Sequence, residues 1–356
     1  MANPLVTHVL WTLGRGGAER MVWDLARLLP AQGFDVRVLA AGGGGEMESE
    51  LRDASVPYAV NPRAGSRRAA LAFLRADIAA HRPTVWHSHL TPVWAGLAAR
   101  SSRVRPWIAT IHGFESKLPW PMRVSRGFAY RAADHVVCVS EAVRESMGST
   151  IGSRDVSVIP PGIDLSRFPP REARLAADVP ELLTVSRLVP EKGIDVLLEA
   201  LSESLRPWRL TIVGDGPELP ALRRRAEVLG ILPRVRFAGA VSDPAPFYRR
   251  ADVFCFPSRS EGQGMALLEA AASRVPAVAS DLPAIREAFG EDGVAYAAPG
   301  DVDGWRHAIE RVLSRYPEAL TRAERASRTV SQRYSLTSMV EAHASLYRRL
   351  WEEARI

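Results

Sequence analysis

The stretch Ser260–Ala270, SEGQGMALLEA, contains two glutamates, Glu261 and Glu269, with seven residues between them. Burying a lone carboxylate is costly, so an acid among alanines and leucines is either paired or in use. Carboxylates accept hydrogen bonds from adjacent hydroxyls, as sugars present them, and these two acids could hold two parts of one such ligand. The alternative is a helix-capping acid followed by an acid at the edge of the core.

Two cations, Arg187 and Lys192, flank a turn in SRLVPEKGID. Such a pair suits a diphosphate leaving group, because fixed positive charge stabilises negative charge as it develops. Two solvated surface cations are the alternative. Of the 46 basic residues only Lys117 and Lys192 are lysines. A lysine in an arginine-dominated chain suggests a need for a compact ammonium group.

The first half has a glycine loop and a histidine at positions that favour ligand binding. Gly14, Gly16 and Gly17 follow an apolar run and precede a helix-like segment, where free N–H groups suit phosphate. The dinucleotide spacing G-x-G-x-x-G is absent, and a tight turn is the alternative. His112 ends another apolar run in TIHGFESK, and a buried core histidine is the alternative there.

No metal site is expected from the sequence. His87 and His89 in WHSHL would share one face of a strand, but no third ligand is close to them in sequence. Cys138 and Cys255 lie in apolar runs without a metal-ligand spacing. The motif DVD at 301–303 resembles a D-x-D metal motif, but it begins a helix-like surface segment. We therefore predict no metal and no other cofactor.

Short β-branched runs alternate with amphipathic segments in two successive series. This alternation is typical of parallel sheets covered by helices on both faces. It predicts an α/β fold with two doubly wound, Rossmann-like domains. Open parallel sheets bind ligands at the carboxyl ends of their strands, so we expect the two domains to face each other across a cleft.

The expected domain boundaries follow from a Pro- and Arg-rich segment, LSRFPPREARLAADVPE, that has no strand pattern. We assign residues 1–168 to a first domain and residues 169–335 to a second. Residues 336–356 have helical periodicity and are expected to pack back on the first domain.

Composition and charge limit the classes of partner. With 356 residues, 47% hydrophobic and 24% charged, the chain is typical of two globular domains. It has no apolar run long enough to span a membrane, and its start lacks the pattern of a signal peptide, so a cytoplasmic protein is expected. The first 165 residues carry 19 Lys and Arg against 14 Asp and Glu, which favours anionic partners. No nucleic-acid-binding signature is present, so nucleic acid is not expected.

Taken together, these residues resemble glycosyltransferase family 4, retaining enzymes of the GT-B architecture. The resemblance covers nearly the whole chain and rests on GGAER, IHG, VSE, IPPGID, SRLVPEKGID, IVGDGPE and PSRSEGQGMALLEAAASRVPAVAS, which occur in the family's order. It implies transfer of a hexose or N-acetylhexosamine from a nucleotide-sugar donor, UDP-linked more than GDP-linked, to a hydroxyl of an acceptor. It also implies that no metal is required.

For the second half, the resemblance implies a donor site. Glu261 would contact the donor hexose, Glu269 would hold the ribose hydroxyls, and Arg187 with Lys192 would stabilise the departing diphosphate. Other donor contacts would come from backbone and small residues at Gly214, Val241, Gly262, Gln263 and Gly264.

For the first half, the resemblance implies contacts to both substrates. His112 would hydrogen-bond the donor sugar, and Gly16 and Gly17 would approach its phosphates. Gly14 and Lys117 would lie on the acceptor side. Loops around 42–66 and 113–127 would select the acceptor, which is a glycan, a lipid-linked molecule or a small molecule.

The sequence departs from the family pattern at three positions. Gln263 replaces a common aromatic, Pro161 a common asparagine, and Ser186 a frequent glycine. These departures concern the sugar and the local geometry. A nucleotide-sugar epimerase, a phosphorylase and a non-catalytic scaffold subunit remain as alternatives.

Basic segments of the first half are candidates for an anionic membrane surface. NPRAGSRRAALAFLRADIAAHR and KLPWPMRVSRGFAYR place arginines beside Phe73, Trp120 and Phe128. A basic amphipathic helix can lie on anionic lipid, so the enzyme could be peripheral at the inner face of the membrane. Solvated faces of domain helices are the alternative.

Overall fold

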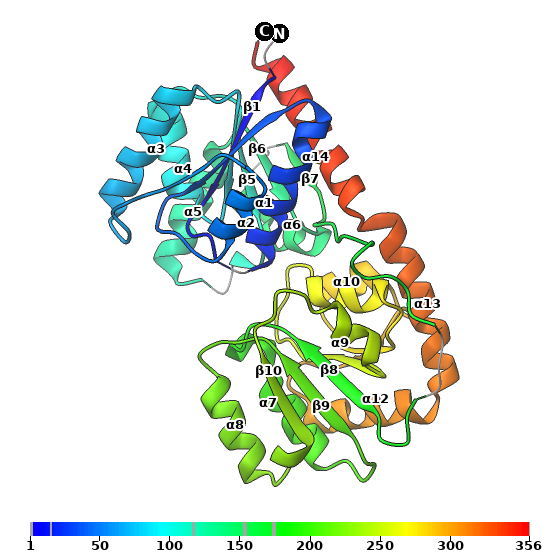
Figure 1. Ribbon diagram of the computed structural model, residues 1–356. Helices are drawn as coiled ribbons and strands as arrows, with labels where there is room; N and C mark the ends of the chain where they lie inside the picture. Colours follow the sequence, from blue (N-terminus) through cyan, green and yellow to red (C-terminus); the bar gives the residue numbers. More distant parts are fainter. Residues whose placement is uncertain (1–2, 15, 116–117, 152–154, 173–175, 356) are drawn as a thin grey trace. The chain divides into compact units, whose positions relative to one another are not determined.

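The computed structural model describes residues 3–14, 16–115, 118–151, 155–172 and 176–355 (Figure 1). The chain forms two compact units, residues 1–162 with 336–356, and residues 163–335. The sequence places the first boundary after residue 168, whereas the structure divides the chain after Gly162. The reason is that Ile163 and Phe168 are both buried in the core of the second unit.

The first unit contains a parallel seven-stranded sheet in the order β3-β2-β1-β4-β5-β6-β7. Its strands are β1 (Leu5–Leu10), β2 (Asp35–Ala40), β3 (Tyr58–Val60), β4 (Val85–His89), β5 (Trp107–Ile111), β6 (His135–Cys138) and β7 (Val156–Val158). Its α-helices are α1 (Gly17–Leu28), α2 (Met47–Asp53), α3 (Arg67–His81), α4 (Pro92–Ser101), α5 (Trp120–Ala132), α6 (Glu141–Met147) and α14 (Leu336–Glu353).

The second unit contains a parallel six-stranded sheet in the order β10-β9-β8-β11-β12-β13. Its strands are β8 (Glu181–Val185), β9 (Arg209–Val213), β10 (Val235–Gly239), β11 (Val253–Phe256), β12 (Ala277–Ser280) and β13 (Ala295–Ala297). Its α-helices are α7 (Ile194–Ser202), α8 (Leu219–Val228), α9 (Ala245–Arg250), α10 (Met265–Ala272), α11 (Pro283–Phe289), α12 (Val302–Ser314) and α13 (Tyr316–Arg333).

Each sheet is covered on both faces, as its continuous apolar strands require. In the first unit, one core joins β1 and β2 to α1 and α14, and the other joins β4 and β5 to α3 and α4. In the second unit, one core contains α7 and α12, and the other contains α10, α11 and α13. The strand order of each sheet reverses next to its first strand, between β1 and β4 and between β8 and β11. These switch points are where open parallel sheets bind ligands.

The last helix, α14, belongs to the first unit. Met339, Val340 and Tyr347 are buried in the same core as β1 and α1. The chain therefore crosses from the first unit to the second before Ile163 and returns after Ser335, where a β-bridge joins these two residues.

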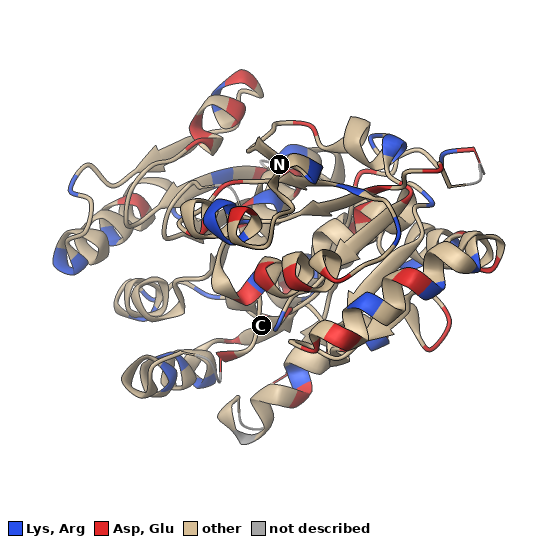
Figure 2. Ribbon diagram, turned by 90° about the horizontal axis from the view of Figure 1, so that it is seen from below, with Lys and Arg blue, Asp and Glu red and all other residues tan. Residues whose placement is uncertain are grey.

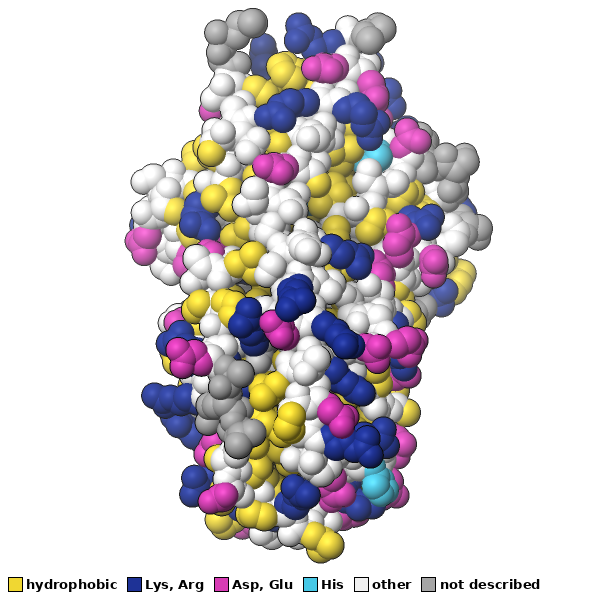
Figure 3. Space-filling model, turned by 90° about the vertical axis from the view of Figure 1, so that its right-hand side faces the viewer, with side chains coloured by type: hydrophobic (Ala, Val, Ile, Leu, Met, Phe, Trp, Pro, Cys, Tyr) yellow, Lys and Arg dark blue, Asp and Glu magenta, His cyan; other side chains and the backbone are white. Residues whose placement is uncertain are grey.

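Charged side chains of both signs are interspersed along the helices (Figure 2). The face drawn in Figure 3 likewise mixes basic, acidic and apolar side chains. None of the helices in the described ranges is long and apolar enough to cross a membrane.

Candidate active site

Three loops of the second unit meet at the carboxyl edge of its sheet. The loop after β8 is bound to the loop after β9, since the Leu188 N–H donates to the Asp215 carbonyl oxygen at 2.8 Å. It is also bound to the loop after β11, since the Arg259 N–H donates to the Glu191 carbonyl oxygen at 2.7 Å. Both β8 and β11 border the switch point of the sheet, so the candidate residues on these loops lie where ligand binding is expected.

Two glycines make this close approach of the loops possible. Gly193 has φ +64°, and a Cβ there would overlap the carbonyl oxygen of Pro257 in the loop after β11. Gly214 has φ +135°, and a Cβ there would overlap the carbonyl oxygen of Ser186 in the loop after β8. Glycine is required at both positions by backbone conformation and by space. The Gly214 N–H also donates to the Gly239 carbonyl oxygen at 2.8 Å, which places Gly214 next to the segment that leads to Val241.

Arg259 locks the loop after β11 onto the start of α7. Its guanidinium group donates to both carboxylate oxygens of Asp195, at 2.9 and 2.7 Å. Burial would raise the pKa of Asp195, but the hydrogen bonds and charge of Arg259 outweigh burial and lower it. A bidentate pair of this kind fixes direction as well as distance, so the two loops that carry Lys192 and Glu261 are held in one arrangement.

Lys192 and Glu261 form an ion pair, with Nζ and Oε1 2.5 Å apart. The two side chains are 21% and 11% exposed. The sequence assigned Lys192 to a diphosphate and Glu261 to a sugar as separate contacts, and the structure joins them into one unit. Arg187 is exposed on the same loop as Lys192, and its side chain makes no ion pair or hydrogen bond with the residues that the structure describes. A paired ammonium and an available guanidinium are thus combined at one sheet edge.

Glu269 lies on α10 and is held by a buried tyrosine. The Tyr248 hydroxyl donates to Oε2 of Glu269 at 2.8 Å and lies 3.1 Å from the carbonyl oxygen of Ala266. Burial, together with the charge of Glu269, raises the pKa of Tyr248 well above its usual value. The phenol therefore stays neutral and donates, which orients the carboxylate. Glu269 is paired, as its apolar setting required.

Gly262, Gln263 and Gly264 connect Glu261 to α10. Gly264 has φ +88° and directly precedes the helix, a conformation that strongly favours glycine. The Gln263 side chain is 6% exposed and lies beside Tyr334, whose pKa it lowers against the larger raising effect of burial. Gln263 thus occupies the common aromatic position as a buried residue.

In the first unit, Gly14, Gly16 and Gly17 follow β1 at its carboxyl end. Gly16 precedes α1 in an extended conformation. A Cβ at Gly45 would overlap the backbone of Leu13 and come close to that of Gly14. The absence of a side chain at Gly45 therefore allows the loop after β2 to pack on the loop after β1. Lys117, the other predicted acceptor-side residue, lies outside the described residues.

His112 follows β5 and ends a chain of imidazoles whose other members, His8 and His89, are fully buried. Its Nε2 lies 3.1 Å from Nδ1 of His89, and Nε2 of His89 lies 3.1 Å from Nδ1 of His8. Burial, with smaller contributions from the charges of Arg126 and His343, lowers the pKa of His112 to about 3. His112 is therefore neutral at physiological pH and can donate one hydrogen bond and accept another.

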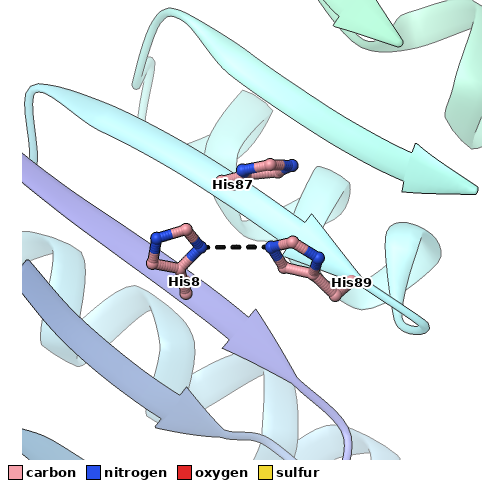
Figure 4. A group of neighbouring side chains, drawn as sticks. All are labelled: His8, His87 and His89. Carbon is pink, nitrogen blue, oxygen red and sulfur yellow. Dashed lines mark hydrogen bonds between the residues drawn. The ribbon is translucent and has the colours of Figure 1, made fainter. Parts of the chain in front are cut away.

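A third histidine lies beside His87 and His89 in the fold. The sequence offered no third ligand for His87 and His89, but β1 supplies His8, and ring nitrogens of the three lie within 4.8 Å of one another. Both nitrogens of His87 are already bonded, to the hydroxyls of Tyr347 and Thr110 at 2.7 Å each. We therefore assign the three histidines to a hydrogen-bond network on one face of the sheet (Figure 4).

The DVD motif has a local structural role at the start of α12. The Asp301 carboxylate accepts from the Gly304 N–H at 3.0 Å and caps the helix, and Asp303 accepts from Arg306 at 2.9 Å. Both acids thus stabilise the first turn of α12.

Each unit also contains a hollow. One of about 310 Å³ is lined by the starts of β12 and β13, which is the opposite edge from the ligand-binding one. Another, of about 290 Å³, lies against α5 in the first unit and is lined by Trp120, Arg123, Phe128 and Arg131 among others. The second hollow is next to the loop expected to select an acceptor.

Comparison with known proteins decides the family. The family model "Glycosyltransferase Family 4" matches residues 15–167, and the family model "Glycosyl transferases group 1" matches residues 179–315. A Mycobacterium tuberculosis protein, "GDP-mannose-dependent alpha-(1-6)-phosphatidylinositol monomannoside mannosyltransferase", is 34% identical over 272 residues, which is 68% of each chain. The chain belongs to glycosyltransferase family 4.

A further relative and a solved structure extend the comparison. A Mycolicibacterium smegmatis protein of the same name is 37% identical over 222 residues, and the alignment spans 55% of this chain and 58% of that relative. The crystal structure of Anabaena HepE in complex with UDP and glucose has a TM-score of 0.85 at 21% identity, over 96% of this chain and 98% of that one. The predicted GT-B fold is confirmed.

Two residues that position the family 4 motifs were not predicted from the sequence. Tyr248 and Arg259 orient Glu269 and the loop of Glu261, respectively. A buried tyrosine normally needs a hydrogen-bond partner, and this was the available signal for Tyr248. The sequence contains no comparable signal for the pairing of Arg259 with Asp195.

Tyr248→Phe is expected to weaken nucleotide binding while leaving the fold intact. The substitution removes one hydrogen bond to a charged group, so we expect the nucleotide Kd to rise roughly three- to tenfold. Isothermal titration calorimetry measures the change. Tyr296→Phe, which removes a tyrosine hydroxyl elsewhere in the same unit, is the matched control. An unchanged Kd in Tyr248→Phe would show that Glu269 is oriented without this hydroxyl.

Proposed function

We propose that this chain is a retaining glycosyltransferase that moves a hexose or N-acetylhexosamine from a nucleotide sugar to an acceptor hydroxyl. The observation that carries the proposal is the set of charged groups at the carboxyl edge of the second sheet. Arg187, the Lys192–Glu261 pair and the Tyr248-bound Glu269 lie on loops or a helix next to the switch point. A nucleotide-sugar donor needs cations that bind its diphosphate and carboxylates that accept hydrogen bonds from its hydroxyl groups.

In the proposed reaction, the acceptor oxygen forms a bond to the anomeric carbon as the bond to the donor phosphate breaks. The departing phosphate oxygen takes the acceptor proton on the same face of the sugar, so the configuration is retained and no protein nucleophile is needed. Arg187 and Lys192 stabilise the charge on the leaving diphosphate. Glu261 binds sugar hydroxyls, Glu269 binds the ribose, and His112 donates to the sugar. The proposal includes no metal.

The donor base is the finer part of the proposal. The sequence resemblance favours UDP over GDP, and the structural neighbour HepE has been solved with UDP and glucose. The relatives at 34% and 37% identity are named as GDP-mannose-dependent enzymes. UDP-glucose, UDP-N-acetylglucosamine and GDP-mannose are therefore the first donors to test.

A donor-hydrolysis assay in the presence of EDTA tests the proposal. The purified chain is incubated with each donor, free nucleoside diphosphate is measured, and the anomeric configuration of the sugar product is read by NMR. We expect slow release from one donor, with the donor's configuration retained. An inverted product would contradict retention, and a requirement for added Mn²⁺ would contradict metal independence. Binding of a donor with neither hydrolysis nor transfer to any acceptor would favour a non-catalytic scaffold.

We also propose that the first unit associates with an anionic membrane surface through α5. Trp120, Val124 and Phe128 are spaced by four residues and so share one helix face, and they are 71%, 38% and 67% exposed. Arg123 and Arg131 line the same hollow as the two aromatics. Exposed aromatics beside basic side chains suit a lipid surface. Phe73, which the sequence grouped with them, packs against the core instead.

Vesicle flotation tests the membrane proposal. The wild-type chain is expected to float with vesicles containing phosphatidylglycerol and not with pure phosphatidylcholine. The double variant Trp120→Ser/Phe128→Ser should lower this binding by at least about tenfold, because each buried aromatic contributes about 1.5 to 3 kcal/mol. Leu205→Ser is the matched control, since Leu205 is 99% exposed in the second unit. Equal flotation of the double variant and wild type would contradict a role for α5.

A further inference from the structure

Three imidazoles form a continuous chain from the interior of the first sheet to the carboxyl end of β5. His8 lies on β1, His89 on β4 and His112 directly after β5, and these three strands are neighbours in the sheet. Two contacts of 3.1 Å join them, His8 Nδ1 to His89 Nε2 and His89 Nδ1 to His112 Nε2. Figure 4 shows the first of these contacts. His112 is the member that the proposed function assigns to the donor sugar.

The chain has two possible directions. A neutral imidazole has one N–H and one lone pair, so each contact fixes which nitrogen of the next ring is protonated. If His8 is protonated on Nδ1, it donates to His89, His89 donates to His112, and His112 keeps its proton on Nδ1. If His8 is protonated on Nε2, every bond reverses, and His112 is left with a lone pair on Nδ1.

The free nitrogen of His8 decides between the two directions. Its Nε2 is buried and has no hydrogen-bond partner among the residues that the structure describes. A buried N–H without an acceptor is rarer and more costly than a buried lone pair. Nε2 of the nearby His343 does not accept from it either, because that nitrogen also has no hydrogen-bond partner among the described residues. His8 is therefore protonated on Nδ1.

We propose that His8 and His89 are positioning residues that hold His112 as its Nδ1–H tautomer. His112 then presents an N–H to the donor, so it binds an oxygen of the sugar and does not act as a general base. The proposal rests on the assignment of His112 to the donor sugar. His87 lies outside the chain because both of its nitrogens are bonded to hydroxyl groups. The sequence alone assigned no role to His8 or His89, and this arrangement gives both the role of positioning His112.

Long-range ¹H–¹⁵N correlation NMR of the full chain with ¹⁵N-labelled histidine tests the tautomer directly. The His112 signals are identified by their absence in His112→Asn. In the free protein at pH 7.5 we expect His112 to be protonated on Nδ1 and unprotonated on Nε2. Protonation on Nε2, a mixture of tautomers, or an imidazolium would overturn the proposal. Because no donor is present, this result does not depend on the proposed transferase activity.

A pair of variants at His89 tests the positioning role. In His89→Asn the side-chain amide can still donate to His112, whereas His89→Leu removes the donor. We expect His89→Leu to give mixed His112 tautomers and to lower kcat by about tenfold or more, as loss of a tautomer-fixing partner does. His89→Asn should retain most of the Nδ1–H tautomer of His112 and most of the wild-type kcat. His307→Asn, at an exposed site in the second unit, should change neither the tautomer nor kcat. A normal tautomer and normal kcat in His89→Leu would exclude positioning by His89. If His89→Leu does not fold, the wild-type spectrum still decides the direction of the chain.

Discussion

Replacing Lys192 with alanine is expected to lower transfer from the nucleotide sugar by about 10²- to 10³-fold, mainly in kcat. Its ammonium lies at the carboxyl edge of the second sheet and is held by Glu261 at 2.5 Å. A preorganised cation of this kind acts most strongly when negative charge develops on the leaving diphosphate. Steady-state kinetics with the preferred donor measures the change. Arg187→Ala should act in the same direction.

The ion pair with Glu261 requires a control, because Lys192→Ala also leaves a carboxylate without its partner. A double-mutant cycle with Glu261→Gln separates the two effects. Arg209→Ala removes an exposed cation near the start of β9 in the same unit and should leave kcat unchanged. If Lys192→Ala keeps more than about half of the wild-type kcat, Lys192 does not stabilise the leaving group. Loss of a contact that stabilises the leaving group would lower kcat by much more than twofold.

The first unit is expected to lose its structure at mildly acidic pH while the second unit stays folded. Burial lowers the pKa of His8 to about 3 and that of His343 to about 4, and it lowers the pKa values of His87 and His89 well below 6.5. Below pH 6.5 these histidines become protonated in the unfolded chain but stay neutral in the folded protein. Each group therefore removes about 1.4 kcal/mol of stability per pH unit between 6.5 and its folded pKa.

The size of this effect can be judged from His8 and His343, which are fully buried in the first unit. Between pH 6.5 and 4.5, His8 and His343 together remove roughly 5 kcal/mol, and His87 and His89 act in the same direction. A typical domain has only about 5 to 15 kcal/mol in total. His307 is the only histidine between residues 163 and 335, so the second unit lacks this source of acid sensitivity.

Hydrogen exchange followed by mass spectrometry at a series of pH values from 7.5 to 4.5, corrected for intrinsic exchange rates, locates the transition. Peptides from β1, β4 and β5 should lose protection near pH 5, and peptides from β8 and β11 should keep it. Asp195, in the second unit, stabilises the fold while its carboxylate is ionised. Because its pKa is lowered in the folded state, this contribution is lost only as the pH falls through the lowered pKa. Protection of β1 and β4 that is constant down to pH 4.5 would contradict the neutral, buried state of these histidines.

The sequence predicted the α/β architecture because the two periodicities are strong in both halves. Buried parallel strands such as VFCF and amphipathic helices such as GAERMVWDLARL leave little ambiguity. The boundary was harder to place, since Ile163 and Phe168 lie in a Pro-rich connection and bury their side chains in the second core. Membership of family 4 followed from motifs spread over nearly the whole chain.

The sequence predicted where the candidate residues lie in the fold but not which side chains they contact. Spacing indicated that Glu261, Glu269, Arg187 and Lys192 lie on loops or helices after strands, and it gave no information on pairs across loops. The Lys192–Glu261 contact joins positions far apart in sequence and depends on the close packing at Gly193. The histidine network was hidden for the same reason, because β1, β4, β5 and α14 contribute to it from distant parts of the chain.

Nucleotide binding by the second unit is the most direct test of the central claim. Thermal shift is measured with UDP, GDP, ADP and TDP on the wild type, on Glu269→Gln, and on Glu227→Gln as an exposed control on α8. One nucleotide at 100 times its Kd should stabilise the wild type and Glu227→Gln by about 2.7 kcal/mol, and Glu269→Gln much less. Stabilisation by no nucleotide, or equal stabilisation of Glu269→Gln, would contradict a donor site built around Glu269.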